Sequence, residues 1–266
     1  MGNTCCGCLI AEKDSYSYES NSRTPLLGSQ VSIPASRAAT NDNFSSARRY
    51  HPPDDSQQFE SSIEAVTTIK ALPVPVLSVD KTFKDQANLY NDLVETCSKL
   101  RAEIHNFKTY FEAETSGIPV LHECFRILVH RCGDAKITIE RKSKTFLYVS
   151  YNPKDVSEKC AVSPEQVIEP LEHYKKACKH AGDVLQHAPH INDSISIIIN
   201  DEKAMLREIT KADLPGDKGV DGMKSVMSNI TKLKQMKVNM DSIQKYTELT
   251  FKELLEASKL FFASSC

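Results

Sequence analysis

The 266-residue sequence has no tryptophan, only nine glycines and no long run of apolar residues. Its triple isoleucine, residues 197–199, lies between Ser196 and Asn200 and falls far short of the roughly 18 apolar residues of a membrane-spanning helix. Neither sign of charge is in excess, since 33 Lys and Arg against 35 Asp and Glu give a formal net charge of -2. These absences argue against a membrane-spanning protein and against a general nucleic-acid binder, which usually has a basic excess.

The motifs of common enzyme classes are also absent. The chain has no phosphate-binding loop, dinucleotide fingerprint, nucleophile elbow or paired metal motif. A secretory signal is not expected, because the apolar run Leu9-Ile10-Ala11 ends at Glu12, whereas such a signal needs about 7–15 apolar residues. We therefore expect a protein that is not an enzyme and that needs no cofactor or catalytic metal.

The first eight residues carry a signal for acylation. Removal of Met1 exposes Gly2, the residue that N-myristoylation requires, and Cys5, Cys6 and Cys8 follow closely enough for palmitoylation. One myristoyl chain binds membranes weakly and reversibly, so the cysteines would supply the second signal. The alternatives are a zinc site, for which three cysteines leave the ligand set incomplete, and an unmodified tail.

The leader Met1-Gly2-Asn3-Thr4-Cys5 resembles the doubly acylated N termini of plant calcium-dependent protein kinases. The resemblance covers the leader alone, because no kinase glycine-rich loop or catalytic loop follows. It implies anchoring at the cytosolic face of a membrane, either the plasma membrane or an endolysosomal one. In that reducing compartment the remaining cysteines are expected to be free thiols.

Composition divides the chain into three parts. Residues 1–11 are the predicted lipidated anchor, and residues 12–81 are a predicted disordered tether and linker. The tether is rich in Ser, Asn, Pro, Asp and Gln and cannot bury enough apolar surface to offset its chain entropy. Pro73 and Pro75 favour an extended linker at its end. Residues 82–266 are the predicted helical bundle domain.

Apolar residues in the third part recur at three-four spacing, which predicts long helices packed side by side. The first such face is Tyr90, Leu93, Cys97, Leu100, Ile104, Phe107 and Phe111. The next helix is expected to begin at Pro119, and a later one runs from Ser163 to Leu185, with Pro189 interrupting it and Asn192 or Asp193 capping the next segment. Residues 218–262 predict one very long helix, or two joined near Asn239.

Residues 135–151 allow two interpretations. Residues 136–139 and 145–149 have strand-like composition and could pair as a hairpin across residues 141–144. A three-four repeat instead continues a helix through Gly133, at Leu128, Cys132, Ala135, Ile139, Lys142, Phe146 and Val149. We favour the helix, because an isolated hairpin is marginally stable in water and no other strand is predicted.

The run Val167-Ile168-Glu169-Pro170-Leu171-Glu172-His173-Tyr174 resembles the V-x-E-P-L-x-x-Y run in the second helix of several BAR domains. Residues 236–262 are similar to the last BAR helix, and the looser resemblance covers residues 82–263. It implies an all-α, elongated antiparallel bundle of the BAR type after a disordered, lipid-anchored N-terminal tail. It also implies a homodimer that binds or senses curved membranes.

The best candidate for contact with anionic lipids is the cluster Lys136, Arg141, Lys142 and Lys144. Two further clusters are Lys175, Lys176 and Lys179, and Lys232, Lys234 and Lys237. Each is equally well explained as an ordinary solvated helix face. The spacing of His173, His180 and His187 by seven favours a polar stripe over a metal site. Two functions remain open: a membrane scaffold, and an endolysosomal adaptor or tether that docks protein partners through its helical faces.

Overall fold

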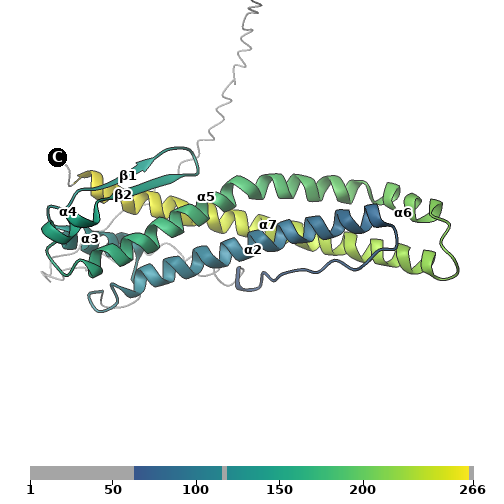
Figure 1. The fold of residues 1–266 in the computed structure, drawn as a ribbon, viewed down its shortest axis with the longest axis horizontal. Helices are drawn as coiled ribbons and strands as arrows, with labels where there is room; N and C mark the ends of the chain where they lie inside the picture. Colours follow the sequence, from purple (N-terminus) through teal and green to yellow (C-terminus); the bar gives the residue numbers. More distant parts are fainter. Residues whose placement is uncertain (1–62, 116–118, 264–266) are drawn as a thin grey trace, which may run out of the picture. The chain divides into compact units, whose positions relative to one another are not determined.

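The computed structural model describes residues 63–115 and 119–263, and three long helices make up most of them (Figure 1). They are α2 (Leu77–Thr109), α5 (Glu165–Asn200) and α7 (Lys218–Ala263), with α5 antiparallel to the other two. Shorter helices α3 (Leu121–Cys132), α4 (Pro153–Lys159) and α6 (Glu202–Lys211) and strands β1 (Ile137–Arg141) and β2 (Leu147–Tyr151) complete this part. The predicted helical class is confirmed, with one hairpin added to it. No helix in the described ranges is long and apolar enough to cross a membrane.

The core face of α2 follows the predicted spacing. All of the predicted positions are buried, namely Tyr90, Leu93, Cys97, Leu100, Ile104 and Phe107 in α2 and Phe111 just after it. Near the end of α2, the Phe107 ring packs against Phe125 of α3 and Tyr174 of α5, with centroids 5.2 and 6.0 Å away. Tyr174 donates its hydroxyl to the Leu254 carbonyl of α7 at 3.1 Å. This aromatic cluster therefore joins the three long helices. It stabilises the fold through both its buried apolar area and the geometry of its ring contacts.

Residues 137–151 form a β-hairpin, so the favoured helix over residues 135–151 is wrong. The strands pair antiparallel with Ile139 opposite Val149, and both side chains are buried. In the helical register Phe146 would join the core, whereas it is 40% exposed. Gly133 ends α3 with a φ of 54°, which a continuing helix cannot adopt. The hairpin is stable here because β2 packs on α5 and β1 on α7.

Helix α5 continues through both of its prolines, so the interruption predicted at Pro189 is also wrong. A proline inside a helix removes the hydrogen bond from its own nitrogen to the carbonyl four residues earlier. For Pro170 that carbonyl belongs to Gln166, and the Arg131 guanidinium donates to it at 3.2 Å instead. Pro189 occupies an exposed position, where the lost bond leaves the core undisturbed. Helix α7 is likewise continuous through Asn239.

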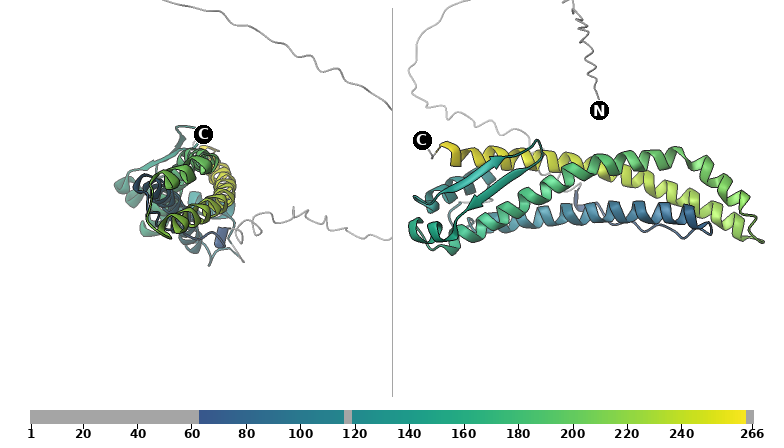
Figure 2. Two further views of the ribbon diagram at one scale, coloured as in Figure 1. Left: turned by 90° about the vertical axis from the view of Figure 1, so that its right-hand side faces the viewer. Right: turned by 45° about the horizontal axis from the view of Figure 1, so that its top comes forward.

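The packed body begins before the predicted boundary at residue 82. Residues 66–76 form an extended strap that lies against α2 and α7 before α2 starts at Leu77 (Figures 1 and 2). The Asn91 side chain of α2 accepts from the Ile69 N–H at 2.8 Å and donates to the Ile69 carbonyl at 3.1 Å. Asn229 of α7 holds Leu72 in the same way, at 2.7 and 2.8 Å. The end of the predicted linker is therefore part of the fold.

Candidate membrane-binding surface

The anchor predicted at the N terminus lies outside the described residues. This applies to Gly2, Cys5, Cys6 and Cys8 and to the predicted tether up to residue 62. The structure therefore bears on the second predicted site, the cationic cluster around residue 140.

The cationic cluster lies on the hairpin and is divided between its two ends. Lys136 precedes β1 at the open end, where its backbone N–H donates to the Asp155 carboxylate at 2.8 Å. Arg141, Lys142 and Lys144 lie at the turn. A strand rises about 3.3 Å per residue, so Lys136 is separated from the turn by roughly 17 Å. Three of the four predicted residues are thus brought together.

Hydrogen bonds give the hairpin turn a defined shape. The Arg141 guanidinium donates to the carbonyls of residues 143 and 144 at 3.1 and 2.9 Å. Lys142 pairs with Glu140, and its ammonium lies 5.5 Å from the centre of the Tyr148 ring. Lys144 is exposed and forms no ion pair within the described part of the chain. Arg141 therefore has a structural role, and Lys142 and Lys144 are the cations that the turn presents to solvent.

A close approach to α5 places the turn beside a second lysine cluster. Gly182 is buried in α5, and a β-carbon built on it would lie 2.8 Å from the Thr145 carbonyl oxygen. Only a residue without a side chain allows the turn to lie this close to the helix. Lys175, Lys176 and Lys179 precede Gly182 on the same helix. Two clusters that are more than 30 residues apart in sequence therefore share one surface.

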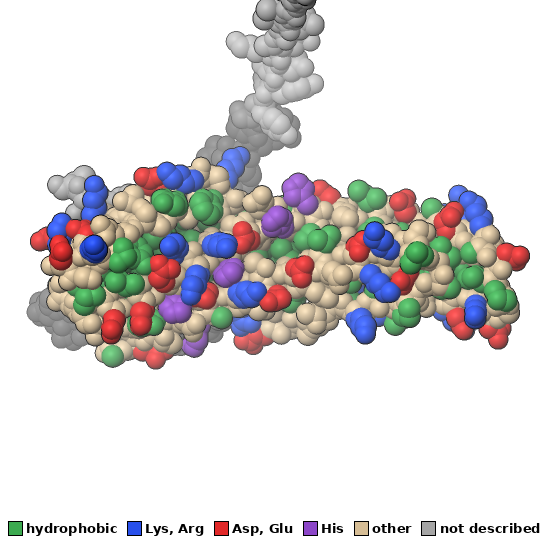
Figure 3. All heavy atoms as spheres, in the orientation of Figure 1, with side chains coloured by type: hydrophobic (Ala, Val, Ile, Leu, Met, Phe, Trp, Pro, Cys, Tyr) green, Lys and Arg blue, Asp and Glu red, His purple; other side chains and the backbone are tan. Residues whose placement is uncertain are grey.

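A groove of about 360 Å³ lies between β2 and α5. It is lined by Phe146, Leu147, Tyr148, Val149, Glu172, Lys175, Lys176, Lys179 and Asp183. Leu147 and Val149 are buried, whereas Phe146 and Tyr148 remain 40% and 45% exposed. Basic and apolar side chains lie side by side over the hairpin and the adjoining part of α5 (Figure 3). The groove therefore has an apolar wall from the hairpin and a cationic wall from the helix.

The helical wall carries three lysines against Glu172 and Asp183, which leaves a net charge of +1. Glu172 accepts from the Tyr151 hydroxyl at 2.5 Å and lies 3.4 Å from the Lys175 ammonium. The hydrogen bond from Tyr151 is the main cause that lowers the pKa of Glu172, so this carboxylate is ionised at neutral pH. Lys176 and Lys179 form no ion pair among the residues that the structure describes. They leave the groove with a positive potential.

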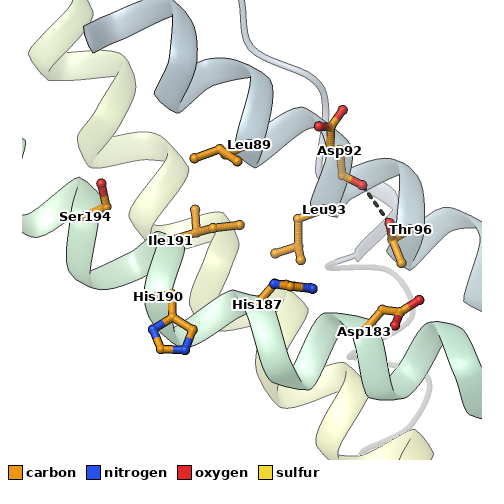
Figure 4. Close-up of a pocket in the computed structure, with 9 residues that line it drawn as sticks. All are labelled: Leu89, Asp92, Leu93, Thr96, Asp183, His187, His190, Ile191 and Ser194. Carbon is orange, nitrogen blue, oxygen red and sulfur yellow. Dashed lines mark hydrogen bonds between the residues drawn. The ribbon is translucent and has the colours of Figure 1, made fainter.

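A second groove, of about 370 Å³, lies between α2 and α5 and shares Asp183 with the first. Figure 4 shows Leu89 and Leu93 of α2 and Ile191 of α5 directed into the space between the helices, with His187 beside them. Leu89 is 48% exposed, whereas Leu93 and Ile191 are buried. This groove is therefore apolar at its base and polar at its rim.

The three histidines spaced by seven lie in different surroundings. His173 pairs with Glu103 of α2 at 2.6 Å, and His187 lines the groove between α2 and α5. Burial lowers the pKa of His180. Within the described ranges no three His, Cys, Asp or Glu side chains lie close enough together to hold a metal ion.

The aromatic residues of the surface were not identified as site residues from the sequence. Their signal is the period-two alternation in residues 146–149, where Leu147 and Val149 are buried and Phe146 and Tyr148 are not. That alternation becomes informative only once the segment is known to be a strand. The proximity of the two lysine clusters had no sequence signal, because it depends on how the hairpin folds back onto α5.

Comparison with known proteins gave no relative: no family model matches the chain, and neither the curated proteins nor the solved structures yielded a match.

Proposed function

We propose that this chain is a lipid-anchored scaffold of BAR-like type that binds the cytosolic face of the plasma membrane or of endolysosomal membranes. The supporting observation is that the α5 lysine cluster lines one groove with the half-exposed Phe146 and Tyr148, and that Lys142 of the turn lies over the Tyr148 ring. Each cation close to an anionic surface contributes about 1 kcal/mol, and aromatic rings favour the headgroup region. A chain with a net charge of -2 thus keeps one locally basic, aromatic face.

Attachment in this proposal has two parts. Myristate on Gly2 and palmitate on Cys5, Cys6 and Cys8 hold the chain at the membrane, and the hairpin surface orients the folded body. Gly2→Ala should make a tagged full-length chain cytosolic, and replacing the three cysteines together should leave weak, reversible attachment. Imaging in cells tests both, and full membrane retention of Gly2→Ala would rule out the anchor.

The hairpin surface is tested without the anchor, by vesicle flotation of the Gly2→Ala protein. Lys142→Glu with Lys144→Glu should reduce flotation with phosphatidylserine vesicles, and high salt should have the same effect, because surface charges are screened within about 10 Å at 0.1 M. The matched control reverses Lys203 and Lys211 on α6, at the other end of the bundle (Figure 1). Arg141 is left intact because it shapes the turn. Flotation that responds to neither charge reversal nor salt would remove this surface from the proposal.

A homodimer is the assembly that the BAR resemblance implies, and the outer face of α7 supports it. Val220, Met227, Val238 and Leu249 are 52%, 56%, 62% and 39% exposed. At about 100° per residue their spacing puts all four within roughly 40° of one face. Light scattering should show a dimer that Met227→Glu with Val238→Glu converts to a folded monomer. A monomeric wild-type chain would argue against the BAR-like assembly.

The groove between α2 and α5 favours the second candidate function, an adaptor that docks protein partners. Its exposed Leu89 beside Leu93 and Ile191 is an apolar base of the kind that anchors a partner side chain. Two results together would favour the adaptor over the membrane scaffold: no vesicle binding by the folded body, and loss of a bound protein partner in the Leu89→Glu variant.

A further inference from the structure

We propose that the groove between β2 and α5 binds one anionic phospholipid molecule. Its phosphate would lie on Lys176 and Lys179, and the part of an acyl chain nearest the headgroup would lie against Phe146 and Tyr148. This inference rests on the proposed membrane function and makes it more specific. A charged surface attracts any anionic bilayer, whereas a groove selects a headgroup.

The dimensions of the groove suit a small ligand. Its volume of about 360 Å³ lies within the range of roughly 300–1,000 Å³ that is usual for ligand pockets. The hairpin forms one wall and α5 the other, so a bound chain would contact apolar side chains on one side and cations on the other. The exposed rings of Phe146 and Tyr148 lose water contact when a chain covers them, which favours binding.

The charges specify where a phosphate would lie. Lys176 and Lys179 are three residues apart on α5, so their side chains are neighbours on the helix surface. Two lysines match the charge of about -1.5 to -2 that a phosphate monoester carries at neutral pH. Asp183 and the ionised Glu172 line the same groove and would repel a phosphate placed beside either of them, which leaves the position over Lys176 and Lys179. We therefore expect preference for a lipid with a terminal phosphate monoester over zwitterionic phosphatidylcholine, whose choline cation would meet the lysines.

The groove walls are held in place before any ligand arrives. The Tyr151 hydroxyl ties β2 to Glu172 of α5 at 2.5 Å, and the turn lies against Gly182. Lys175 is in turn positioned by Glu172 at 3.4 Å. A site whose walls are already ordered loses less conformational entropy on binding, so specific binding requires fewer contacts.

The test uses monomeric lipid and no membrane. The Gly2→Ala protein is titrated with dihexanoyl phosphatidic acid below its micelle concentration, with dihexanoyl phosphatidylcholine and with glycerol 3-phosphate, followed by calorimetry and NMR. We expect one site for the phosphatidic acid and at least tenfold weaker binding of the other two. Lys176→Gln with Lys179→Gln should weaken phosphatidic acid binding by about 10- to 30-fold, since each cation contributes about 1 kcal/mol. Lys203→Gln with Lys211→Gln on α6 is the matched control and should change nothing.

A further variant separates a lipid from a free phosphate. Phe146→Ala should weaken phosphatidic acid binding and leave glycerol 3-phosphate unchanged, because only the lipid has a chain to contact the ring. Equal affinity for phosphatidic acid and glycerol 3-phosphate, or insensitivity to the lysine variants, would overturn the proposal. Vesicle flotation without monomer binding would retain the membrane function and reject the lipid site, and monomer binding without flotation would do the reverse.

Discussion

Arg131 connects three elements at one end of the bundle. Its side chain is 8% exposed, and its guanidinium donates to the carbonyl of Tyr110, which caps the C-terminal end of α2, at 3.0 Å and to the carbonyl of Gln166 in α5 at 3.2 Å. It also pairs with Glu114 and lies 4.7 Å from the centre of the Phe111 ring. A single buried cation thus satisfies the Tyr110 carbonyl at the C-terminal end of α2 and the Gln166 carbonyl that Pro170 leaves without its usual donor.

Arg131→Gln should lower the free energy of unfolding by about 2–6 kcal/mol, because two carbonyls lose their donor and each unmet group costs about 1–3 kcal/mol. Urea unfolding measures this. Arg126→Gln is the matched control, since Arg126 pairs with Glu123 at the surface, where such pairs contribute about 1 kcal/mol or less. Equal losses in the two variants would show that Arg131 has no special role.

Asp80 gives the fold a dependence on pH. Its carboxylate pairs with Lys84 at 2.6 Å and accepts from the Val74 N–H of the strap at 2.9 Å, and these two hydrogen bonds, that of Lys84 first, lower its pKa. A carboxylate whose folded pKa is lowered stabilises the fold above its unfolded pKa of about 3.9 and loses that effect as pH falls through the folded value.

Stability should therefore fall more steeply below about pH 4 in the wild type than in Asp80→Asn, which has no charge to titrate but retains an acceptor for Val74. Urea unfolding of both proteins at about pH 6, 4 and 3 provides the comparison. Parallel pH profiles would mean that Asp80 does not contribute to the acid sensitivity.

Among the elements, the hairpin depends most on one contact with a neighbour. Gly182→Ala would bring a β-carbon within 2.8 Å of the Thr145 carbonyl, so the turn must move away from α5. We expect a lower urea midpoint and faster amide exchange in β2. Gly219→Ala in α7 meets no atom within 4 Å and should leave stability unchanged or raise it by up to about 1 kcal/mol through helix propensity. Similar behaviour of the two variants would contradict the close approach.

The elements that periodicity predicted well are those with one long buried face. The face of α2 from Tyr90 to Phe107 is buried as expected, and α7 is one helix. Periodicity failed over residues 137–151 because apolar residues there fit both a three-four and an alternating pattern. The interruption predicted at Pro189 failed for a different reason. One missing hydrogen bond at an exposed position costs less free energy than ending a helix whose residues before and after Pro189 pack in the core.

The candidate surface was predictable in part for a related reason. Lys142 and Lys144 stand out as cations in the sequence, but the tertiary packing of the hairpin on α5 is what brings Lys176 and Lys179 beside Phe146 and Tyr148. The sequence predicts tether and linker over the strap because the whole segment before residue 82 is poor in large apolar residues and Pro73 and Pro75 disfavour helix. Proline does not exclude packing, and the Asn91 and Asn229 side chains supply the hydrogen bonds that a sheet would otherwise provide.

At the scale of the whole molecule, the strap should stabilise the bundle. A chain that starts at Leu77 lacks the buried Val74 and the packed Ile69, and it exposes the surface that they cover on α2 and α7. Burying one such side chain contributes about 1.5–3 kcal/mol to stability. We therefore expect the thermal unfolding midpoint of the chain starting at Leu77 to lie about 5–10 °C below that of a chain starting at Ile63. Thermal unfolding followed by circular dichroism measures this, and equal midpoints would show that the strap is dispensable.

The direction of the strap also determines how the chain responds to mechanical load. Thr67 bonds to Tyr90 and Val74 bonds to Asp80, so the strap runs antiparallel to α2 before Leu77. Tension applied to the chain before Ile63 therefore acts on the strap's far end and opens its bonds one after another, at a lower force than shearing them together would require. Peeling residues 66–76 releases about 35–40 Å of chain. The long helices bear load only after the strap has been fully detached and extended.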